Sequence, residues 1–406
     1  MKTFTIAIIG GGAAGLVLAT SLPTKENIAL FERGERLGRK LSSTGNGQGN
    51  VTNVRAREEK YFSSSAAGDA FAREKIGVYD ENSLQAFLQE KGLLLIADER
   101  GRVYPAGRQA SAITDALRFD VEQKGVNVYL TTKITDIQKT PYGFSLTAET
   151  PEGKAEFCAE TVVLCTGGKA AKNFGTDGTA YALAEKLGHT VTALYPSLVQ
   201  LKTDTAYTKT LKGIRVNDGI LTAVTGAQEK ITVQGDIIFT DYGVSGDAVF
   251  RISAFIASEA HQGNTQLFID FLPDFTEEQV YKALFSKKER FANLAVGELL
   301  CGIVNNQIGR AILKRANGDL KLAASYVKAF PLKVVGSLGF DYAQVTKGGI
   351  PIDEVDENLQ SRFAKGLYFA GEILDLDGQC GGFNLQWAYS SARTVADAII
   401  TGKKTK

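Results

Sequence analysis

Two short apolar runs flank a segment of small side chains at the start of the chain. Residues 4–9 and 28–31 are almost wholly apolar, which is typical of parallel strands covered on both faces. Residues 13–22 between them favour a helix of small side chains. The first 31 residues therefore predict a strand–helix–strand unit.

The rest of the first half carries one more helical pattern and several strand-like runs. Leu84, Phe87 and Leu88 recur at helical spacing, which predicts a helix over 70–91. Residues 33–60 are polar and rich in glycine, so we expect a loop with a possible short helix inside it. Apolar runs predict strands, two of them in a meander, at 126–130, 144–147 and 161–165.

The pattern changes after about residue 190. Short strand-like runs separated by turn residues predict a small antiparallel β domain, at 199–202, 220–224, 230–233 and 236–240. Residues 247–329 are helical in pattern, and Thr276 followed by two glutamates marks a helix start. Strands return after Pro331, with a last parallel strand over 366–372 and a final helix over 384–400. These shifts indicate an α/β domain that is interrupted by an insertion and completed by the C-terminus.

The composition is that of an ordinary globular protein of 406 residues. It has 46 Lys and Arg against 45 Asp and Glu, a net charge of +1, which argues against a nucleic-acid partner. Its 43 glycines exceed the usual share and predict many tight turns and close backbone approaches. The four cysteines form no CxxC pair and the two histidines, His189 and His261, are far apart, so we expect free thiols and no metal site. We expect His189 to cap a helix end and His261 to lie at the surface.

No apolar stretch reaches the ~18 residues that a membrane span needs. The N-terminal apolar run leads directly into Gly10-Gly11-Gly12 without a cleavage site, so we interpret it as a buried strand. The sequence therefore predicts a cytoplasmic protein with no membrane partner. It leaves the oligomeric state open.

The strongest local motif is Gly10-Gly11-Gly12-Ala13-Ala14-Gly15, a GxGxxG between a strand and a helix. Such glycines allow a tight turn, bring backbone against a pyrophosphate and let helix and strand pack closely. Glu32 ends the next strand, where a carboxylate can accept hydrogen bonds from a ribose. Arg33 beside it could neutralise part of that charge. A chance glycine turn is the alternative to dinucleotide binding.

The C-terminal region favours FAD over NAD. A strand ending in Gly371-Glu372 is followed by Asp375 and then by Gly381-Gly382 at the start of the last helix. A helix N-terminus there would carry a partial positive charge beside the far end of a long cofactor and would stabilise anionic reduced flavin. The alternative is a C-terminal helix with an ordinary glycine turn.

Motifs spread in order over the whole chain resemble one bacterial flavoprotein family, the NAD(P)/FAD-dependent oxidoreductases of the aminoacetone oxidase type. They include residues 10–15, 38–41, 49–53, 164–168, 175–178, 196–199, 239–246, 347–350 and 367–387. The resemblance implies an FAD-binding domain of the glutathione-reductase type at 1–190 and 345–406. It implies a β-barrel-like domain at 191–246 and 330–344, with a helical insertion at 247–329.

The resemblance also implies non-covalent FAD and a set of residues that bind it. The ADP half is assigned to Gly10, Gly12, Ala14, Gly15, Glu32, Arg33 and, through its backbone, Ile134. Lys40, Asn50 and Thr52 are assigned to the pyrophosphate and ribityl chain, and Thr166 and Gly167 are expected to close over the dinucleotide. The flavin end is assigned to Gly371, Glu372, Asp375, Gly382, Asn384, Leu385 and Gln386.

Two departures from the family pattern stand out. Many relatives carry an Arg-Cys pair where this chain has Gln48-Gly49, so chemistry that depends on that pair should not be transferred. Lys347 occupies a position where a small residue is usual and is a candidate for assisting dioxygen reduction. An exposed turn lysine is the alternative, and the sequence leaves the catalytic side chains unassigned.

The resemblance implies an enzyme that oxidises a small primary amine with dioxygen, aminoacetone giving methylglyoxal, ammonia and hydrogen peroxide. A first alternative is an NAD(P)H-dependent flavin reductase acting on an unsaturated or keto substrate. A second is a non-enzymatic FAD protein, such as a sensor or an RNA-modification partner. A single GxGxxG motif argues against a separate nicotinamide domain.

Overall fold

The computed structural model describes residues 2–258 and 263–404, and they form two compact units. The first unit combines Met1–Tyr195 with Val345–Lys406, and the second is Pro196–Gln344. The chain thus leaves the first unit once and returns to it. The domain boundaries given above remain a prediction, and His261 lies outside the described residues.

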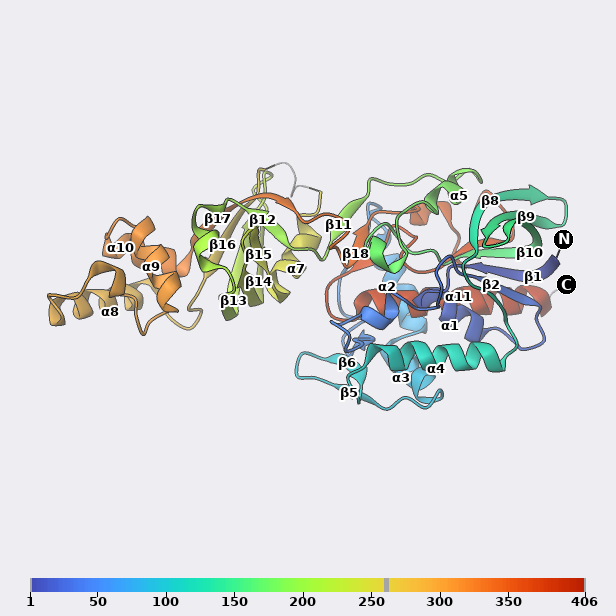
Figure 1. Ribbon diagram of the computed structural model, residues 1–406, viewed down its shortest axis with the longest axis horizontal. Helices are drawn as coiled ribbons and strands as arrows, with labels where there is room; N and C mark the ends of the chain where they lie inside the picture. Colours follow the sequence, from blue (N-terminus) through green and yellow to red (C-terminus); the bar gives the residue numbers. More distant parts are fainter. Residues whose placement is uncertain (1, 259–262, 405–406) are drawn as a thin grey trace. The chain divides into compact units, whose positions relative to one another are not determined.

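A mostly parallel sheet forms the centre of the first unit (Figure 1). Its strand order is β7-β2-β1-β10-β9-β8, and β19 pairs with the end of β10. The strands are β1 (Lys2–Ile9), β2 (Ile28–Phe31), β7 (Asn127–Tyr129), β8 (Lys133–Thr140), β9 (Gly143–Thr150), β10 (Gly153–Leu164) and β19 (Leu367–Phe369). Since β7, β2, β1, the end of β10 and β19 are parallel, their carboxyl ends meet at one edge of the sheet.

Helices of the first unit cover this sheet, and α1 packs against α4 and α11 (Figure 1). They are α1 (Ala13–Ser21), α2 (Gly68–Val78), α3 (Glu81–Gln89), α4 (Ala110–Gln123), α5 (Tyr181–Glu185) and α11 (Phe383–Lys404). Ile6 and Ile8 of β1 and Leu16 of α1 are completely buried in one continuous core. Each side chain of this size contributes about 1.5–3 kcal/mol when fully buried.

Smaller elements of the first unit surround the carboxyl edge. A three-stranded sheet has the order β3-β6-β5, and β4 pairs with β20. These elements are β3 (Thr52–Asn53), β4 (Tyr61–Phe62), β5 (Leu95–Ala97), β6 (Arg102–Pro105) and β20 (Asp377–Gly378), with the short 3-10 helices η1 (Leu41–Ser43), η2 (Lys172–Phe174) and η5 (Ile352–Glu354). Strands β11 (Tyr195–Ser197) and β18 (Val345–Lys347) lie where the chain passes from one unit to the other.

The second unit is a closed antiparallel barrel with helices, in the strand order β12-β15-β14-β13-β16-β17. The strands are β12 (Leu201–Thr203), β13 (Arg215–Val224), β14 (Lys230–Phe239), β15 (Gly243–Ser245), β16 (Gln266–Asp270) and β17 (Phe330–Ser337). The helices are α6 (Thr205–Thr208), α7 (Asp247–Phe255), α8 (Glu277–Arg290), α9 (Asn306–Arg315) and α10 (Leu320–Lys328), with η3 (Lys209–Leu211) and η4 (Val296–Glu298). Barrel and helices share one apolar core. The predicted fold class, an α/β domain with a small β-barrel and helices, is confirmed.

The single helix predicted over 70–91 is wrong, because Asp80 divides it into α2 and α3. Asp80 is extended, and its carboxylate accepts hydrogen bonds from the backbone N–H groups of Asn82 and Ser83. Aspartate is a favoured N-cap residue, so it begins a new helix here although the apolar spacing continues. Thr276, by contrast, is the predicted start of α8 and forms a capping box with Gln279.

Three further predictions, two of strands and one of a helical segment, also need correction. Residues 126–130 were expected in a meander, but β7 lies parallel to β2. Residues 230–233 and 236–240 form one strand, β14, in which Gly235 leaves room for α7; a Cβ there would lie 2.9 Å from Asp247 Oδ2. Strand β16 lies within the segment predicted to be helical, because Leu267 and Ile269 complete the barrel between β13 and β17.

Candidate cofactor site

The GxGxxG turn joins β1 to α1 at the carboxyl edge of the parallel sheet. Gly10 has φ +106°, and a Cβ there would lie 2.4 Å from the carbonyl oxygen of Cys165. A Cβ on Gly15 would lie 1.9 Å from the carbonyl oxygen of Gly10. These two glycines are therefore required by the close approach of β1, β10 and α1, as the motif predicts.

Gly12 differs from these two glycines because a Cβ there would meet no heavy atom within 4 Å. Gly12 is the N-cap of α1, and no side chain caps that helix. The first N–H groups of a helix lack intrahelical partners and favour an anion. The structure therefore leaves backbone donors and open space together at the position predicted for the pyrophosphate.

Two further predicted residues have buried side-chain oxygens without a partner. Within residues 2–258 and 263–404, no group forms a hydrogen bond with Asn50 Oδ1 or Thr166 Oγ1. A buried polar atom without a partner is unfavourable, so each is suited to a group that arrives with a ligand. Together with Gly12, these atoms fit the binding of a dinucleotide such as FAD.

Glu32 lies directly after β2 and binds the neighbouring backbone. Its carboxylate accepts hydrogen bonds from Gly11 N at 2.9 Å and from Gly34 N at 2.7 Å. Each carboxylate oxygen has a further lone pair, so a ribose hydroxyl can still donate to it. Thr132 N donates to Glu32 O at 2.9 Å, which brings the start of β8 and the predicted Ile134 to the same end of the sheet.

Arg33 binds Asp177, which sequence reasoning left without a role. The distance from Arg33 Nη1 to Asp177 Oδ1 is 2.9 Å, and Asp177 also accepts from Thr179. Despite partial burial, hydrogen bonds from Thr179 and Arg33 lower the pKa of Asp177 to about 2. Asp177 lies in the quoted Gly175–Gly178 motif, which was the available signal for it.

The structure joins predicted residues that lie far apart in the sequence. Lys40 Nζ is 2.7 Å from Glu372 Oε2, and the other carboxylate oxygen of Glu372 accepts from Thr346 N at 2.9 Å. Thr52 Oγ1 donates to Gln386 Oε1 at 2.6 Å. Thr346 was missed, because its contacts depend entirely on the tertiary fold.

The remaining predicted residues lie at the start of α11, in the turn before it, or in the loops that follow β10 and β19. A Cβ on Gly382 would lie 2.4 Å from the backbone of Thr52, and one on Gly371 would lie 3.0 Å from Ala14 Cβ. Asn384 bonds to the backbone of Gly378 through both its oxygen and its nitrogen. Leu385 is half-buried, and Gly167 has the left-handed φ of +68°. The carboxylate of Asp375 accepts two hydrogen bonds from Ser64. The roles of all these residues in binding a cofactor remain predictions.

The missing Arg-Cys pair has a local explanation on this chain. Gly49 has φ +79°, and a Cβ there would lie 2.9 Å from Ala110 Cα and 2.8 Å from Ile113 Cδ1. The backbone at this point packs directly on α4, so a cysteine would not fit without a shift. Gln48 is exposed.

Lys347 is half-buried in β18, and its ammonium group lies 4.5 Å from the centre of the Phe62 ring. The alternative of an exposed turn lysine is therefore wrong. A role in dioxygen reduction remains a prediction.

His189 has the structural role that was predicted for it. Its N–H donates to Ala184 O after α5, and its buried ring contacts Glu354 at 2.8 Å and Ser361 at 2.7 Å. Burial lowers the pKa of His189 more than Glu354 raises it. None of the four cysteines, all within the described residues, is in a disulfide bond, and Cys165 is buried.

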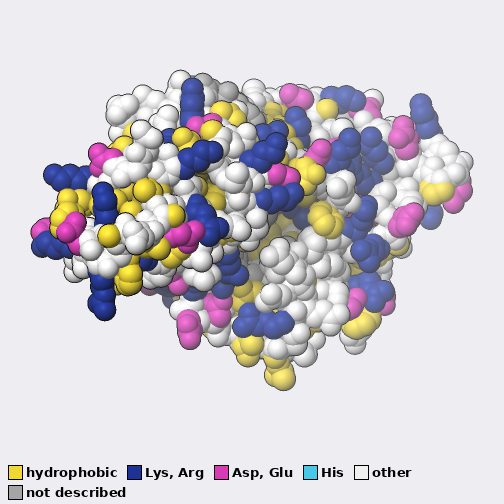
Figure 2. Space-filling view, turned by 60° about the vertical axis from the view of Figure 1, so that its left-hand side comes forward, with side chains coloured by type: hydrophobic (Ala, Val, Ile, Leu, Met, Phe, Trp, Pro, Cys, Tyr) yellow, Lys and Arg dark blue, Asp and Glu magenta, His cyan; other side chains and the backbone are white. Residues whose placement is uncertain are grey.

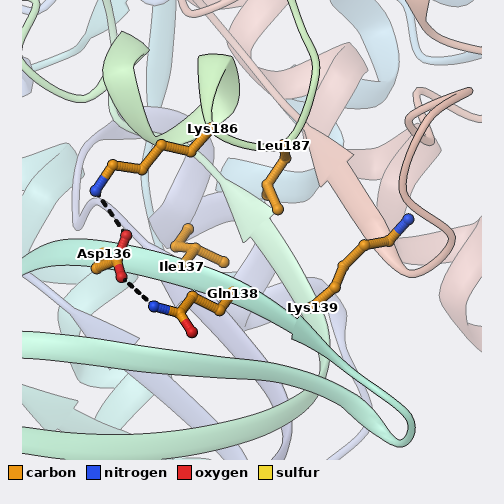
Figure 3. Close-up of a pocket in the computed structure, with 6 residues that line it drawn as sticks. All are labelled: Asp136, Ile137, Gln138, Lys139, Lys186 and Leu187. Atoms are coloured by element: carbon orange, nitrogen blue, oxygen red, sulfur yellow. Dashed lines mark hydrogen bonds and ion pairs between the residues drawn. The ribbon is translucent and has the colours of Figure 1, made fainter.

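A surface hollow of about 530 Å³ lies away from these residues, on β8 and just after α5 (Figure 3). Its lining is Asp136, Ile137, Gln138, Lys139, Lys186 and Leu187. Asp136 accepts from Lys186 at 2.6 Å and from Gln138 at 2.8 Å, and these bonds hold its pKa below the ordinary value. The hollow shares no residue with the predicted cofactor set.

The profile of the HI0933-like protein Rossmann domain matches residues 4–398. The chain belongs to this family. Two proteins named as reductive enzymes resemble the chain over nearly their whole length. Membership of the narrower aminoacetone oxidase type remains a prediction.

The chain is 32% identical to the 3-dehydro-bile acid delta(4,6)-reductase of Clostridium scindens, over 95% of this chain and 96% of that protein. It is 27% identical to the ribosomal RNA dihydrouridine synthase of Escherichia coli, over 100% of both chains. Among solved structures, the 3-ketosteroid-delta4-(5alpha)-dehydrogenase of Rhodococcus jostii aligns with a TM-score of 0.52 at 16% identity, covering 98% of this chain and 97% of that one. This last likeness shows a shared fold.

No helix in the described part of the chain is both long and apolar enough to cross a membrane. The predicted cytoplasmic location remains a prediction.

Proposed function

We propose that the protein is an FAD-dependent oxidoreductase that reduces a carbon–carbon double bond conjugated to a carbonyl group. The observation that carries the proposal is full-length similarity to two enzymes whose names share this chemistry. A 3-dehydro-bile acid with a double bond at position 4 is an enone. Uridine becomes dihydrouridine when the double bond next to its C4 carbonyl is reduced.

The site supports this chemistry through the way it would hold the cofactor. FAD, when bound, supplies the hydride that such a reduction needs. The N-terminus of α1 with Gly12 would hold the pyrophosphate, and the Lys40–Glu372 pair lies between the two halves of the predicted set. The start of α11, after Gly382, would place a partial positive charge beside the flavin end.

In the overall reaction one NAD(P)H and one proton reduce the carbon–carbon double bond, and the products are NAD(P)⁺ and the saturated compound. Hydride adds to the carbon that is β to the carbonyl, and negative charge develops on the carbonyl oxygen. The protein must therefore orient the β carbon, exclude water and deliver a proton to the α carbon.

The charge of the chain bears on the class of substrate within this chemistry. Lys and Arg side chains are more prominent than Asp and Glu on the face that Figure 2 draws, although the net charge of the whole chain is only +1. The near-neutral net charge gives no support to a polyanion, so the proposal takes a small enone as the first substrate to test. The prediction of no nucleic-acid partner stays open to the same test, because one kind of relative acts on ribosomal RNA.

The test begins with protein purified with bound FAD, which acid precipitation should release if it is non-covalent. The FAD protein is mixed anaerobically with NADPH or NADH, and then with a 4-ene-3-one steroid or with unmodified ribosomal RNA. Fast reduction by a nicotinamide and reoxidation by one of these acceptors support the proposal.

Aminoacetone oxidation, with dioxygen as acceptor and peroxide and ammonia as products, remains a prediction and is the contrasting outcome. If aminoacetone reduces the flavin while no nicotinamide does, the proposed reductase is wrong. Supplying aminoacetone under air and following oxygen uptake, ammonia and peroxide measures this directly.

A further inference from the structure

Tyr104 belongs to the small sheet that contacts the glycine turn leading into α11, although the sequence separates them widely. Tyr104 is in β6, where Arg102 pairs with Asn53 of β3. Residues two apart on a strand share a face, so Tyr104 is on the same face as Arg102 and Asn53. Asn53 Nδ2 donates to Gly381 O at 3.3 Å, which fixes the turn against this face.

The surroundings of Tyr104 are unusual for a tyrosine of a small sheet. Its side chain is only 5% exposed, and the Arg108 guanidinium lies 4.1 Å from the ring centre, with that of Arg102 at 6.0 Å. Within the described residues no group forms a hydrogen bond with its hydroxyl, and the hydroxyl oxygen is not fully shielded from solvent. A hydroxyl that solvent reaches can also contact a bound ligand.

Four charged or titratable groups act on this hydroxyl. Burial raises the pKa of Tyr104; Asp98 and Cys380 act in the same direction, and Arg102 and Arg108 oppose them. The phenol therefore carries its proton at neutral pH, while two guanidinium groups are in place to stabilise the phenolate that remains after it gives the proton away. Cys380 belongs to the turn before α11, which places this electrostatic contact at the predicted flavin end of the site.

We propose that Tyr104 is the proton donor to the α carbon of the substrate, an inference that rests on the proposed function. Hydride forms a new C–H bond at the β carbon, and the electron pair of the double bond moves toward the carbonyl. The O–H bond of Tyr104 breaks, its proton forms the C–H bond at the α carbon, and water returns a proton to the phenolate. Arg108 acts as a positioning residue through its stacking on the ring.

The decisive variant is Tyr104→Phe, which keeps the ring and its contact with Arg108 and removes only the hydroxyl. A matched control is Tyr142→Phe, since Tyr142 is 90% exposed. Both variants should bind FAD with wild-type affinity and accept hydride from NAD(P)H at the wild-type rate. Reoxidation of the reduced Tyr104→Phe enzyme by the enone should be about 10²–10⁴ times slower, the usual contribution of a general acid.

Each outcome of this experiment has a distinct meaning. Reoxidation of Tyr104→Phe at the wild-type rate would overturn the role of Tyr104 and leave the proposed function standing. If no enone or RNA reoxidises the wild-type enzyme, the proposed function is wrong and Tyr104 loses its role with it. A variant that no longer binds FAD would show a structural role for Tyr104 and would also overturn the proposal.

A second measurement does not depend on turnover. Titration of phenolate absorbance near 295 nm, as wild type minus Tyr104→Phe, isolates the ionisation of Tyr104 in the FAD protein. Arg108→Met should move this ionisation to higher pH, because the cation that stabilises the phenolate is gone while Arg102, Asp98 and Cys380 remain. An unchanged titration would show that Arg108 does not act on the hydroxyl of Tyr104 and would contradict its role as a positioning residue.

Discussion

Gly12→Ala should weaken binding of the cofactor while leaving the stability of the apoprotein almost unchanged. The new methyl group meets no heavy atom within 4 Å, and the backbone of Gly12 is extended with φ −82°, which alanine adopts freely. Alanine is a poorer N-cap than glycine, so we expect the free energy of unfolding without FAD to fall by at most about 1 kcal/mol.

The same methyl group should strongly weaken FAD binding. A phosphate oxygen that accepts from the first N–H groups of α1 lies about 2.9 Å from the nitrogen, in the space that the methyl group would take. Losing one hydrogen bond to a charged group costs about 1.5–3 kcal/mol, which raises the dissociation constant of FAD about ten- to a hundred-fold.

The assay is titration of apoprotein with FAD, followed by quenching of flavin fluorescence, alongside urea unfolding of the apoprotein. Gly77→Ala is the control, because Gly77 lies within α2, also meets no atom within 4 Å, and is not in the predicted site. Wild-type FAD affinity in Gly12→Ala would refute the placement of the pyrophosphate at this turn. A loss of several kcal/mol in the apoprotein would show that the space over Gly12 is not open.

Three further outcomes are expected. Glu32→Ala should weaken FAD binding about ten- to a hundred-fold more than Glu35→Ala, whose side chain is exposed; equal dissociation constants would remove Glu32 from the site. Burial lowers the pKa of His189 below the unfolded value of about 6.5, so protonation below that pH favours the unfolded chain. The Tm of the wild type should therefore fall more steeply below that pH than the Tm of His189→Gln, and parallel Tm curves would contradict this. Lys347→Met should slow reoxidation of dithionite-reduced flavin by dioxygen in stopped flow, relative to the exposed-site control Lys25→Met, and equal rates would make Lys347 a bystander.

The sequence by itself determined the features that depend on neighbouring residues. The glycine spacing of residues 10–15 predicts a strand, a tight turn and a helix start, and within the motif Gly15 packs directly against the backbone of Gly10. Thr276 determined the start of α8 through a capping box whose two members are only three positions apart. Periodicity also distinguished the α/β part from the antiparallel barrel.

Only the tertiary structure decided which distant residues act together. Lys40 meets Glu372 across 332 residues, and Thr52 meets Gln386 across 334. Tyr104 was not singled out by any motif. Arg108 is close to it along the chain, but Cys380 acts on it only when β6 and the turn before α11 come together. Local propensity carries no information about such pairs, because their energy comes from burial and charge at a contact that exists only in the folded chain.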